Sequence, residues 1–191
     1  MKLAAALLST FGLTLAPALA GDALPYATVG DWEVLVDTSV AGCFMLATWT
    51  KGDVMRLGFD NSNKNGYVMI ANPAWRSVEY GKEYKLSLEF DGGTPWTGTF
   101  RATKLGDLTV LANSFKDPEF LRDFGAKQRV AIYYDGKLVT TLPLTGSFAA
   151  MESLIECQTK VDAIANTPAA PSDPFSGGGR TRPAADPFSS R

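Results

Sequence analysis

Few residues of this chain could carry chemistry, and histidine is not among them. The 191-residue sequence contains no histidine and only two cysteines, Cys43 and Cys157. Nucleophilic sites of the serine–histidine or cysteine–histidine kind need an imidazole base, and many zinc, copper and iron sites need histidine ligands, so both are excluded. A reaction would have to use carboxylates, lysines or backbone groups. We therefore expect no catalytic residue, no metal and no cofactor, and a protein that is not an enzyme.

Two oxygen-rich segments imitate known sites but lack a required residue. "VLVDTSVAG" places Asp37 after an apolar strand, as in aspartic proteases, but Ser39 stands where that loop needs glycine. "NSNKNGYVMIAN", residues 61–72, imitates a calcium loop, but its first ligand positions are neutral asparagines and Asn72 replaces the bidentate glutamate. Both segments are better interpreted as strand ends, the second as a hairpin with Asn65-Gly66 at its turn.

The spacing of apolar residues near the C-terminus predicts that Cys157 points inward from a helix. From residue 147 onward they recur at steps of three and four, which is the spacing of one helix face. Cys157 lies on that face, and Cys43 begins "CFMLATW", a predicted buried strand. In an oxidising compartment we expect the pair to form a disulfide that fastens the helix to the sheet. Two buried free thiols, or a redox pair without the usual C-x-x-C spacing, are the alternatives. The residues of this face are Ala150, Leu154, Cys157, Val161 and Ile164.

The first 20 residues have the composition of a secretory signal peptide. Lys2 precedes an apolar run, and Ala18 and Ala20 fit the small-residue requirement of signal peptidase, which predicts cleavage between Ala20 and Gly21. The apolar run is shorter than the roughly 20 residues that a bilayer span needs, and a proline interrupts it. We expect a bacterial periplasmic or secreted protein that keeps no membrane segment after processing.

Residues 21–166 have the pattern of one mainly β domain. Short segments rich in valine, threonine and aromatic residues alternate with glycine, asparagine, aspartate and proline, which predicts an antiparallel β-sandwich. Asp135-Gly136 between two apolar runs predicts a two-residue hairpin turn. The predicted strands lie near residues 31–37, 43–50, 53–59, 66–72, 83–91, 96–103, 108–113, 128–134 and 138–143.

Two helices are expected within this β domain. In "KDPEFLRDFGAK" we predict Asp117 as the N-cap, Pro118 at the first helical position and Gly125 as the C-terminal stop. The second helix runs from Ser147, a possible cap, to about Asn166 and carries the face of Cys157. The sandwich therefore has one short helix and one C-terminal helix.

Residues 167–191 differ sharply in composition from the domain before them. This segment holds five of the chain's eleven prolines, a glycine triplet and almost no apolar residues apart from Phe175 and Phe188. It cannot bury enough surface to offset its ordering entropy, so we expect a disordered tail. The repeats "SDPFS" and "ADPFS" could be two copies of a docking peptide for a protein partner. A solvated tail without a partner is the alternative.

The aromatic residues suggest where a ligand could bind, and the net charge argues against nucleic acid as a ligand. Trp32 and Trp49 lie on predicted strands and are expected in the core. Trp75 and Trp96 lie near prolines in predicted loops, so they are our candidates for binding a small ligand or a glycan. The formal net charge of −2 gives no electrostatic footprint for nucleic acid.

The order of several short motifs resembles the invasion-associated locus B family of bacterial periplasmic proteins. After the leader come "GDWEVLVD", "GCFMLATW", "GKLVTTLPLTGSFAAMESL" and a terminal cysteine. The resemblance implies a β-sandwich without recognised enzymatic activity, associated with the envelope and, in some relatives, with host-cell colonisation. The expected function is therefore that of an exported, non-catalytic protein acting through envelope or other protein contacts. A periplasmic module that binds a small ligand through Trp75 and Trp96 is the alternative.

Overall fold

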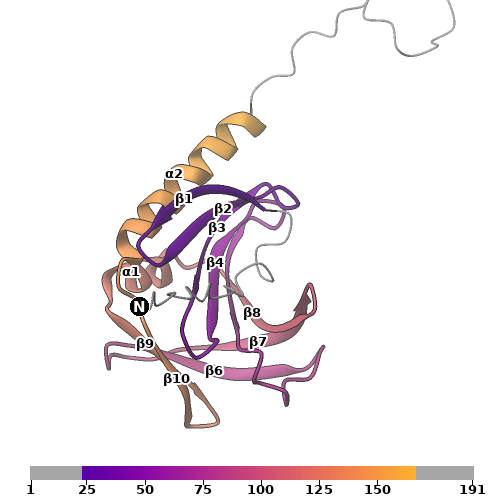
Figure 1. The fold of residues 1–191 in the computed structure, drawn as a ribbon, viewed down its shortest axis with the longest axis vertical. Coiled ribbons are helices and arrows are strands. Elements are labelled where there is room, and N and C mark those ends of the chain that lie inside the picture. The colour runs from indigo at the N-terminus through magenta and orange to yellow at the C-terminus, as the bar shows by residue number, and fades with distance from the viewer. Residues whose placement is uncertain (1–22, 167–191) are drawn as a thin grey trace, which may run out of the picture.

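The computed structural model describes residues 23–166, which form one antiparallel sheet and two helices (Figure 1). The predicted cleavage site at Ala20 and Gly21, and the tail with Phe175 and Phe188, lie outside the described residues. The elements are β1 (Leu24–Val29), β2 (Trp32–Asp37), β3 (Gly42–Thr48), β4 (Val54–Asp60), β5 (Asn65–Ala71), β6 (Glu83–Phe90), β7 (Trp96–Leu105), β8 (Leu108–Phe115), α1 (Pro118–Ala126), β9 (Arg129–Tyr134), β10 (Lys137–Pro143) and α2 (Ser147–Ala165).

All ten strands belong to a single hydrogen-bonded sheet, in the order β1-β2-β3-β4-β5-β8-β7-β6-β9-β10. Figure 1 shows strands β2 to β4 crossing those of the β6, β9 and β10 half at a steep angle, so the sheet folds back on itself. The predicted mainly β, antiparallel fold with two helices is confirmed. It is compatible with a sandwich whose two layers are the two halves of one sheet.

Strand β1 is the element that the sequence analysis missed. It pairs with β2 at one end of the strand order, and its register shifts between Pro25 and Ala27. Proline cannot donate to a β ladder, so it is confined to edges and bulges, and its presence hides an edge strand from the usual sequence pattern.

One of the predicted hairpin turns is confirmed and one is wrong. Asp135 and Gly136 both have positive φ, 49° and 69°, as a type I′ turn requires. Asn65 and Gly66 are instead the first residues of β5, and the turn before them places Lys64 at φ 54°. A side chain at Gly66 would lie 2.5 Å from the ring of Phe115, so this glycine serves close packing and not the turn.

The ends of the helices differ in detail from the prediction. The Asp117 cap is confirmed, since its carboxylate accepts a hydrogen bond from the Glu119 amide at 2.9 Å. Gly125 is not the stop; it lies inside the last turn of α1, buried where α1 meets α2. Ser147 is not a side-chain cap either: Gly146 with φ 79° precedes α2, and the Ser147 hydroxyl donates to the Phe124 carbonyl at 3.2 Å.

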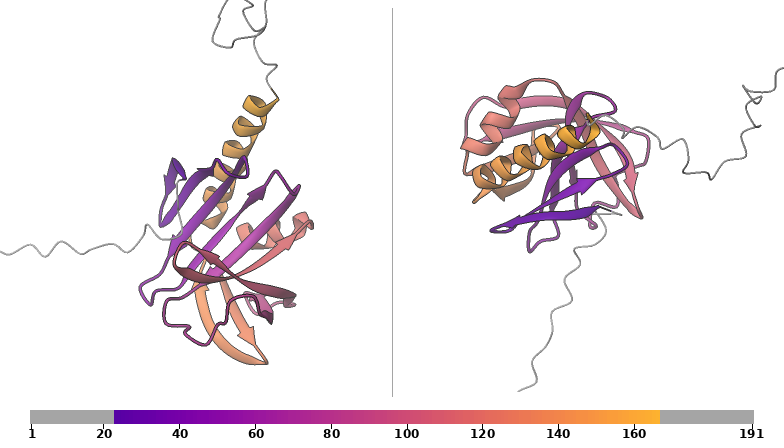
Figure 2. Two further views of the ribbon diagram at one scale, coloured as in Figure 1. Left: turned by 90° about the vertical axis from the view of Figure 1, so that its right-hand side faces the viewer. Right: turned by 90° about the horizontal axis from the view of Figure 1, so that it is seen from above.

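Helix α2 lies across β1, β2 and β3 and buries the face that the sequence predicts (Figure 2). Ala150, Leu154 and Cys157 are fully buried. Ile164 is exposed, contrary to the prediction, because the last turns of α2 extend beyond the sheet (Figure 1). Among residues 23–166, no helix has both the length and the apolar character to cross a membrane.

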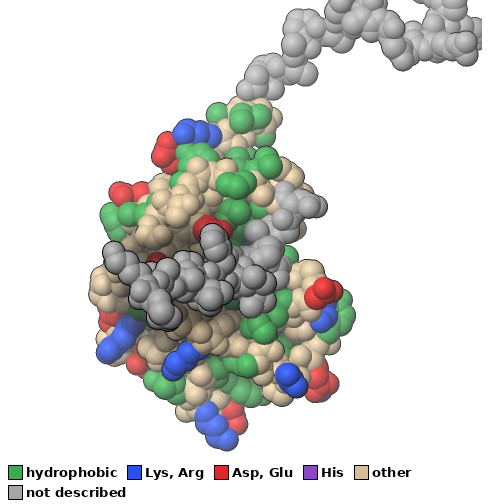
Figure 3. Space-filling model, in the orientation of Figure 1, with side chains coloured by type: hydrophobic (Ala, Val, Ile, Leu, Met, Phe, Trp, Pro, Cys, Tyr) green, Lys and Arg blue, Asp and Glu red, His purple; other side chains and the backbone are tan. Residues whose placement is uncertain are grey.

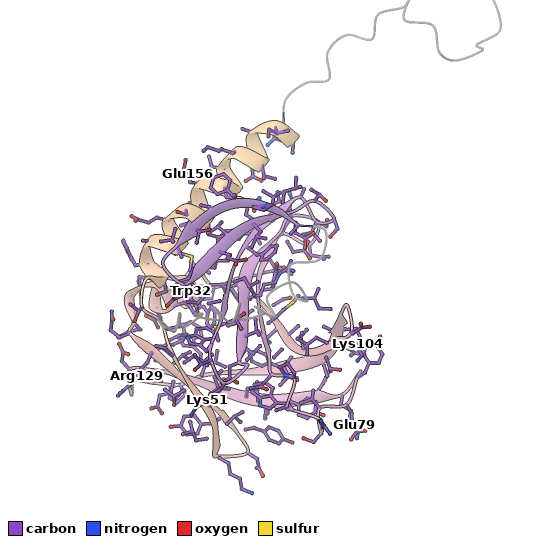
Figure 4. The ribbon with its side chains drawn as sticks, in the orientation of Figure 1. Trp32, Lys51, Glu79, Lys104, Arg129 and Glu156 are labelled. Atoms are coloured by element: carbon purple, nitrogen blue, oxygen red, sulfur yellow. A yellow bond between two sulfur atoms is a disulfide. The ribbon has the colours of Figure 1, made fainter. Side chains whose placement is uncertain are left out.

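The inner core lies between the two halves of the sheet and the two helices. Trp32 is its largest fully buried residue, and its indole N–H donates to the Thr145 carbonyl at 3.1 Å. The edges of Trp49 and Phe124 meet it with ring centroids 5.7 Å away, and Figure 4 places Trp32 where the helices meet the strands. The core positions predicted for Trp32 and, half-buried, for Trp49 are confirmed.

A second buried cluster occupies the opposite face of β2–β5 and β8, which we call the outer face. Because side chains alternate along a strand, Cys43 and Met45 of β3 point into the inner core while Phe44 and Leu46 point to the outer face. The buried apolar residues of the outer face are Leu35, Phe44, Leu46, Val54, Tyr67, Ala71 and Val110.

Candidate functional site

The predicted disulfide between Cys43 and Cys157 is confirmed (Figure 4). Their Cα atoms lie 6.1 Å apart although 114 positions separate them in sequence, and neither residue is exposed to solvent. Next to the bridge, the Gln158 side-chain oxygen accepts a hydrogen bond from the Cys43 amide at 2.8 Å. A covalent bond and a buried polar contact therefore join α2 to the centre of the sheet.

The Asp-Thr-Ser segment provides the partner of a buried arginine. Asp37 is the last residue of β2, and its carboxylate accepts a hydrogen bond from Arg56 at 2.5 Å. Arg56 is almost fully buried on the outer face, where it also donates to the Tyr67 hydroxyl at 2.8 Å and lies 3.5 Å above the Phe44 ring. This arrangement satisfies the guanidinium inside an apolar cluster.

The surroundings of this ion pair shift two pKa values. Burial acts to raise the pKa of Asp37, but hydrogen bonds from Ser39 and Arg56 outweigh it, so the carboxyl has a pKa below its ordinary value. Burial raises the pKa of Tyr67 to about 12, despite the nearby guanidinium. Asp37 therefore stays ionised and Tyr67 stays protonated at neutral pH, which suits a structural network.

A cavity of about 500 Å³, lined mostly by polar residues, lies between the β4–β5 hairpin, the start of α1 and the C-terminal half of α2. Several of its polar groups bind one another: Asp162 accepts from Asn61 at 2.6 Å and from Gln158 at 2.9 Å, and these hydrogen bonds lower its pKa. Within residues 23–166 no group of three or more possible ligands could hold a metal. The side-chain oxygen of Asn65, which also lines this cavity, is buried and has no hydrogen-bond partner.

Trp75 lines an apolar cavity of about 250 Å³ formed by the loop after β5 together with β6, β8, β9 and β10. The rings of Tyr84 and Tyr134 lie 5.7 Å apart in its wall, and the Tyr84 hydroxyl accepts a hydrogen bond from the Glu79 amide at 2.8 Å. The remaining lining is aliphatic apart from Ser77, so the cavity suits an apolar group better than a sugar.

Trp96 lies in a different place, under α1. Its indole N–H donates to Asp123 at 3.0 Å, and its ring meets Phe120 edge-on with centroids 5.6 Å apart. It lines a separate cavity of about 200 Å³. The structure therefore does not bring Trp75 and Trp96 together, and a ligand-binding role for either one stays a prediction.

An apolar groove between α1 and α2, which we call the helix groove, escaped the sequence analysis. It encloses about 450 Å³, and Phe148 and Ile155 remain 62% and 52% exposed in its α2 wall. Their spacing of seven residues puts them on one face of α2, and this spacing could have predicted an exposed apolar face. The groove is lined by Pro118, Leu121, Arg122, Gly125, Ala126, Phe148, Met151, Glu152 and Ile155.

Charged side chains do not form a patch of one sign on the face of the molecule that Figure 3 shows. Lysine, arginine and acidic side chains are scattered over that face. This agrees with the formal net charge of −2 and favours contacts made through apolar surface.

The fold has a solved counterpart. The chain is similar to the crystal structure of invasion associated protein B from Bartonella henselae, with a TM-score of 0.52 and 16% identity, over 71% of this chain and 99% of that one. No family model matches the sequence, and no curated protein matches it. The likeness covers nearly the whole of the other protein, so the resemblance predicted from the strand and helix motifs is confirmed at the level of the fold.

Proposed function

We propose that this protein is an exported, non-catalytic envelope protein that acts by binding another protein. The helix groove carries the proposal, because Phe148 and Ile155 stay exposed beside an almost wholly apolar hollow. Contiguous exposed apolar surface of this kind marks interaction sites on proteins that are otherwise well packed.

Three further observations support export and the absence of catalysis. The fold is similar to that of a protein whose name links it to invasion. The buried Cys43–Cys157 bridge fits the oxidising conditions of the periplasm or the cell exterior. The chain lacks histidine, and the carboxylate with the most elaborate surroundings, Asp37, serves as the partner of Arg56.

The shape of the groove favours an amphipathic helix of the partner. Two helices form its walls, and apolar side chains of a third helix at positions i, i+3 and i+7 would fill such a hollow. Glu152 on the α2 side is exposed, which would select a basic residue at the flank of that helix. The C-terminal tail, with Phe175 and Phe188, would be an accessory contact.

The test is cross-linking in envelope extract with the wild type and a Phe148→Ser/Ile155→Ser variant. Both side chains are exposed, so the variant should keep the fold, and its cross-linked partners should be lost. A Tyr80→Ser variant is the matched control, since Tyr80 is equally exposed but outside the groove. An unchanged set of partners in the double variant would contradict the proposal.

The Trp75 cavity supports a second candidate function, the binding of a small apolar ligand. A cavity of about 250 Å³ walled by one tryptophan and two tyrosines could hold an aromatic or aliphatic group. Binding would quench tryptophan fluorescence in the wild type and in Trp96→Phe but not in Trp75→Phe. Quenching that survives in Trp75→Phe would exclude this cavity.

A further inference from the structure

The cavity between the β4–β5 hairpin, α1 and α2, which we call the hairpin cavity, contains polar groups that the fold leaves without partners. Lys64 and Lys116 line it from two different segments, and within residues 23–166 neither ammonium has a hydrogen bond or an ion pair. Asn65 also lines it, and its buried side-chain oxygen has no donor. A buried acceptor without a donor costs free energy, so its presence needs a reason beyond the fold. A ligand in the cavity would supply that donor.

The carboxylates of the hairpin cavity also have capacity to bind a ligand. Asp60 accepts hydrogen bonds from the amide and the side chain of Asn63, at 3.0 and 2.7 Å. Asp117 accepts from the Glu119 amide, and Asp162 accepts from two side-chain amides. All of these donors are neutral amides, and an ionised carboxylate has about four acceptor positions. Each carboxylate therefore keeps acceptor positions for a ligand.

The mixture of charges in this cavity favours a ligand with neutral groups that both donate and accept. Its walls carry the ammoniums of Lys64 and Lys116 together with the three carboxylates, so a ligand with a strong charge of either sign would meet repulsion. A hydroxyl group donates one hydrogen bond and accepts two, so it can pair with an ammonium, a carboxylate or an amide oxygen. Several hydroxyl groups on one small molecule would satisfy all three kinds of group.

Two phenylalanine rings add an apolar part to the cavity wall. Phe59 and Phe115 both line it, and both are half-buried. A side chain at Gly66 would lie 2.5 Å from the Phe115 ring, so this glycine lets the ring pack directly on β5. The face of an aromatic ring is negatively polarised and attracts C–H groups. A sugar ring matches both parts of the wall, because its edge carries hydroxyl groups and its face carries C–H groups.

We propose that the hairpin cavity binds a neutral sugar ring, either as a free sugar or as the end unit of a glycan. Lys64 and Lys116 donate to hydroxyl oxygens, the Asn65 oxygen accepts from a hydroxyl group, and a phenylalanine ring packs on the C–H face. The cavity volume of about 500 Å³ lies within the range of about 300 to 1,000 Å³ that is typical of small-molecule sites. The hairpin cavity shares no residue with the Trp75 cavity, and its polar groups lie outside the helix groove, so this binding activity is additional to the proposed function.

The test is a titration of the full chain with free sugars, followed by NMR. The panel is glucose, galactose, mannose and N-acetylglucosamine, with glutamine as a zwitterionic probe. We expect saturable binding of at least one sugar and no binding of glutamine. A disaccharide that ends in the same sugar separates the two sources: it binds at least as tightly if the site takes the end of a glycan, and more weakly if the site takes a free sugar. No saturable binding of any sugar, or tighter binding of glutamine, would overturn the proposal.

Lys116→Met tests the donors of the site. The substitution removes a charged donor from an exposed side chain, so the fold should be kept and the affinity for the sugar should fall about tenfold or more. Lys51→Met is the matched control, because Lys51 is also exposed and Figure 4 shows it far from Glu156 in the C-terminal half of α2. An unchanged affinity in Lys116→Met, or an equal loss in Lys51→Met, would contradict the proposal.

Asn65→Leu separates ligand binding from a structural role. The substitution removes the oxygen that has no donor and keeps the number of heavy atoms in the side chain, so the Tm should not fall. The affinity for the sugar should fall about tenfold, because a hydroxyl group of the ligand loses its acceptor. A lower Tm with an unchanged affinity would assign Asn65 to the fold alone and overturn the proposal.

Discussion

The inner core and the outer face share the strands β2–β5 but differ in how they are closed. The inner core is covered by α1 and α2, locked by the Cys43–Cys157 bridge and filled with aromatic rings in edge-to-face contact. The outer face draws only on sheet residues and Ala23, and it carries the buried ion pair of Arg56 and Asp37. The inner core thus combines residues of strands and helices, whereas the buried residues of the outer face all come from strands.

The two sides of the sheet should therefore differ in how much they contribute to the stability of the fold. Edge-to-face aromatic packing around Phe120 and Phe124 tolerates little change, because neighbouring rings fix one another. The outer face instead holds a polar network in which a guanidinium, a carboxylate and a phenol position one another. Stability should therefore depend most on the inner side.

The largest expected effect is on the inner side, in Cys43→Ser. The bridge closes a loop of 114 positions, so its loss should lower the free energy of unfolding by about 3 to 5 kcal/mol. Denaturant titration measures this, and Cys157→Ser should give the same loss. Unfolding midpoints equal to that of the wild type would show that the packing of α2 on the sheet stabilises the inner core without the bridge.

A smaller effect is expected on the outer side, in Arg56→Met. Removing one partner of a fully buried ion pair costs about 3 to 5 kcal/mol, but Asp37 retains some solvent contact, so we expect about 2 kcal/mol. The double variant Arg56→Met/Asp37→Asn should recover part of the loss, because no charge is then left unpaired. A double variant that is less stable than the single one would mean that the Asp37 carboxylate stabilises the fold through its other partner, Ser39.

The stability that the outer face contributes should depend on pH through Asp37. The pKa of Asp37 is lower in the folded than in the unfolded chain, so its contribution is complete above the ordinary pKa and is lost as pH falls through the folded value. Between about pH 5 and pH 3 the wild type should lose more stability than Asp37→Asn. Parallel curves for the two proteins would assign acid unfolding to other carboxyls, Asp162 first among them.

The smallest effect on stability is expected in the helix groove. Phe148→Ser removes a side chain that is 62% exposed, so the free energy of unfolding should change by less than about 0.5 kcal/mol. Thermal unfolding checks this directly. A larger loss would show that Phe148 belongs to the packing between α1 and α2 and would weaken its assignment as a contact for a partner.

Local pattern was enough to predict the disulfide, because a helical face and a buried strand each fix the direction of one cysteine. It was also enough for the Asp135-Gly136 hairpin and the Asp117 cap, which depend on neighbouring residues alone. Strand β1 was missed because Pro25 disguises an edge strand. The inward position predicted for Ile164 was wrong because helical periodicity does not say where the sheet ends.

The candidate sites depended on tertiary arrangement and were harder to predict. Trp75 and Trp96 look alike in sequence, each near a proline, but one lines a cavity beside Tyr84 and the other is fixed by Asp123. The helix groove exists only because α1, from the middle of the chain, packs beside the start of α2. The outer face could not be predicted without the strand order. An apolar run such as "GCFMLAT" indicates that both faces of the strand are buried, but it does not indicate which other strands contribute to each face.

The bridge also makes most of the described chain a closed covalent ring. Every loop between Cys43 and Cys157 lies inside that ring, including the exposed turn at Tyr80. A protease that cuts one such loop therefore leaves a single molecule whose two pieces stay joined through sulfur, with the ten-stranded sheet still able to hold its register. The two pieces of a chain cut in this way should separate only after the bridge is reduced.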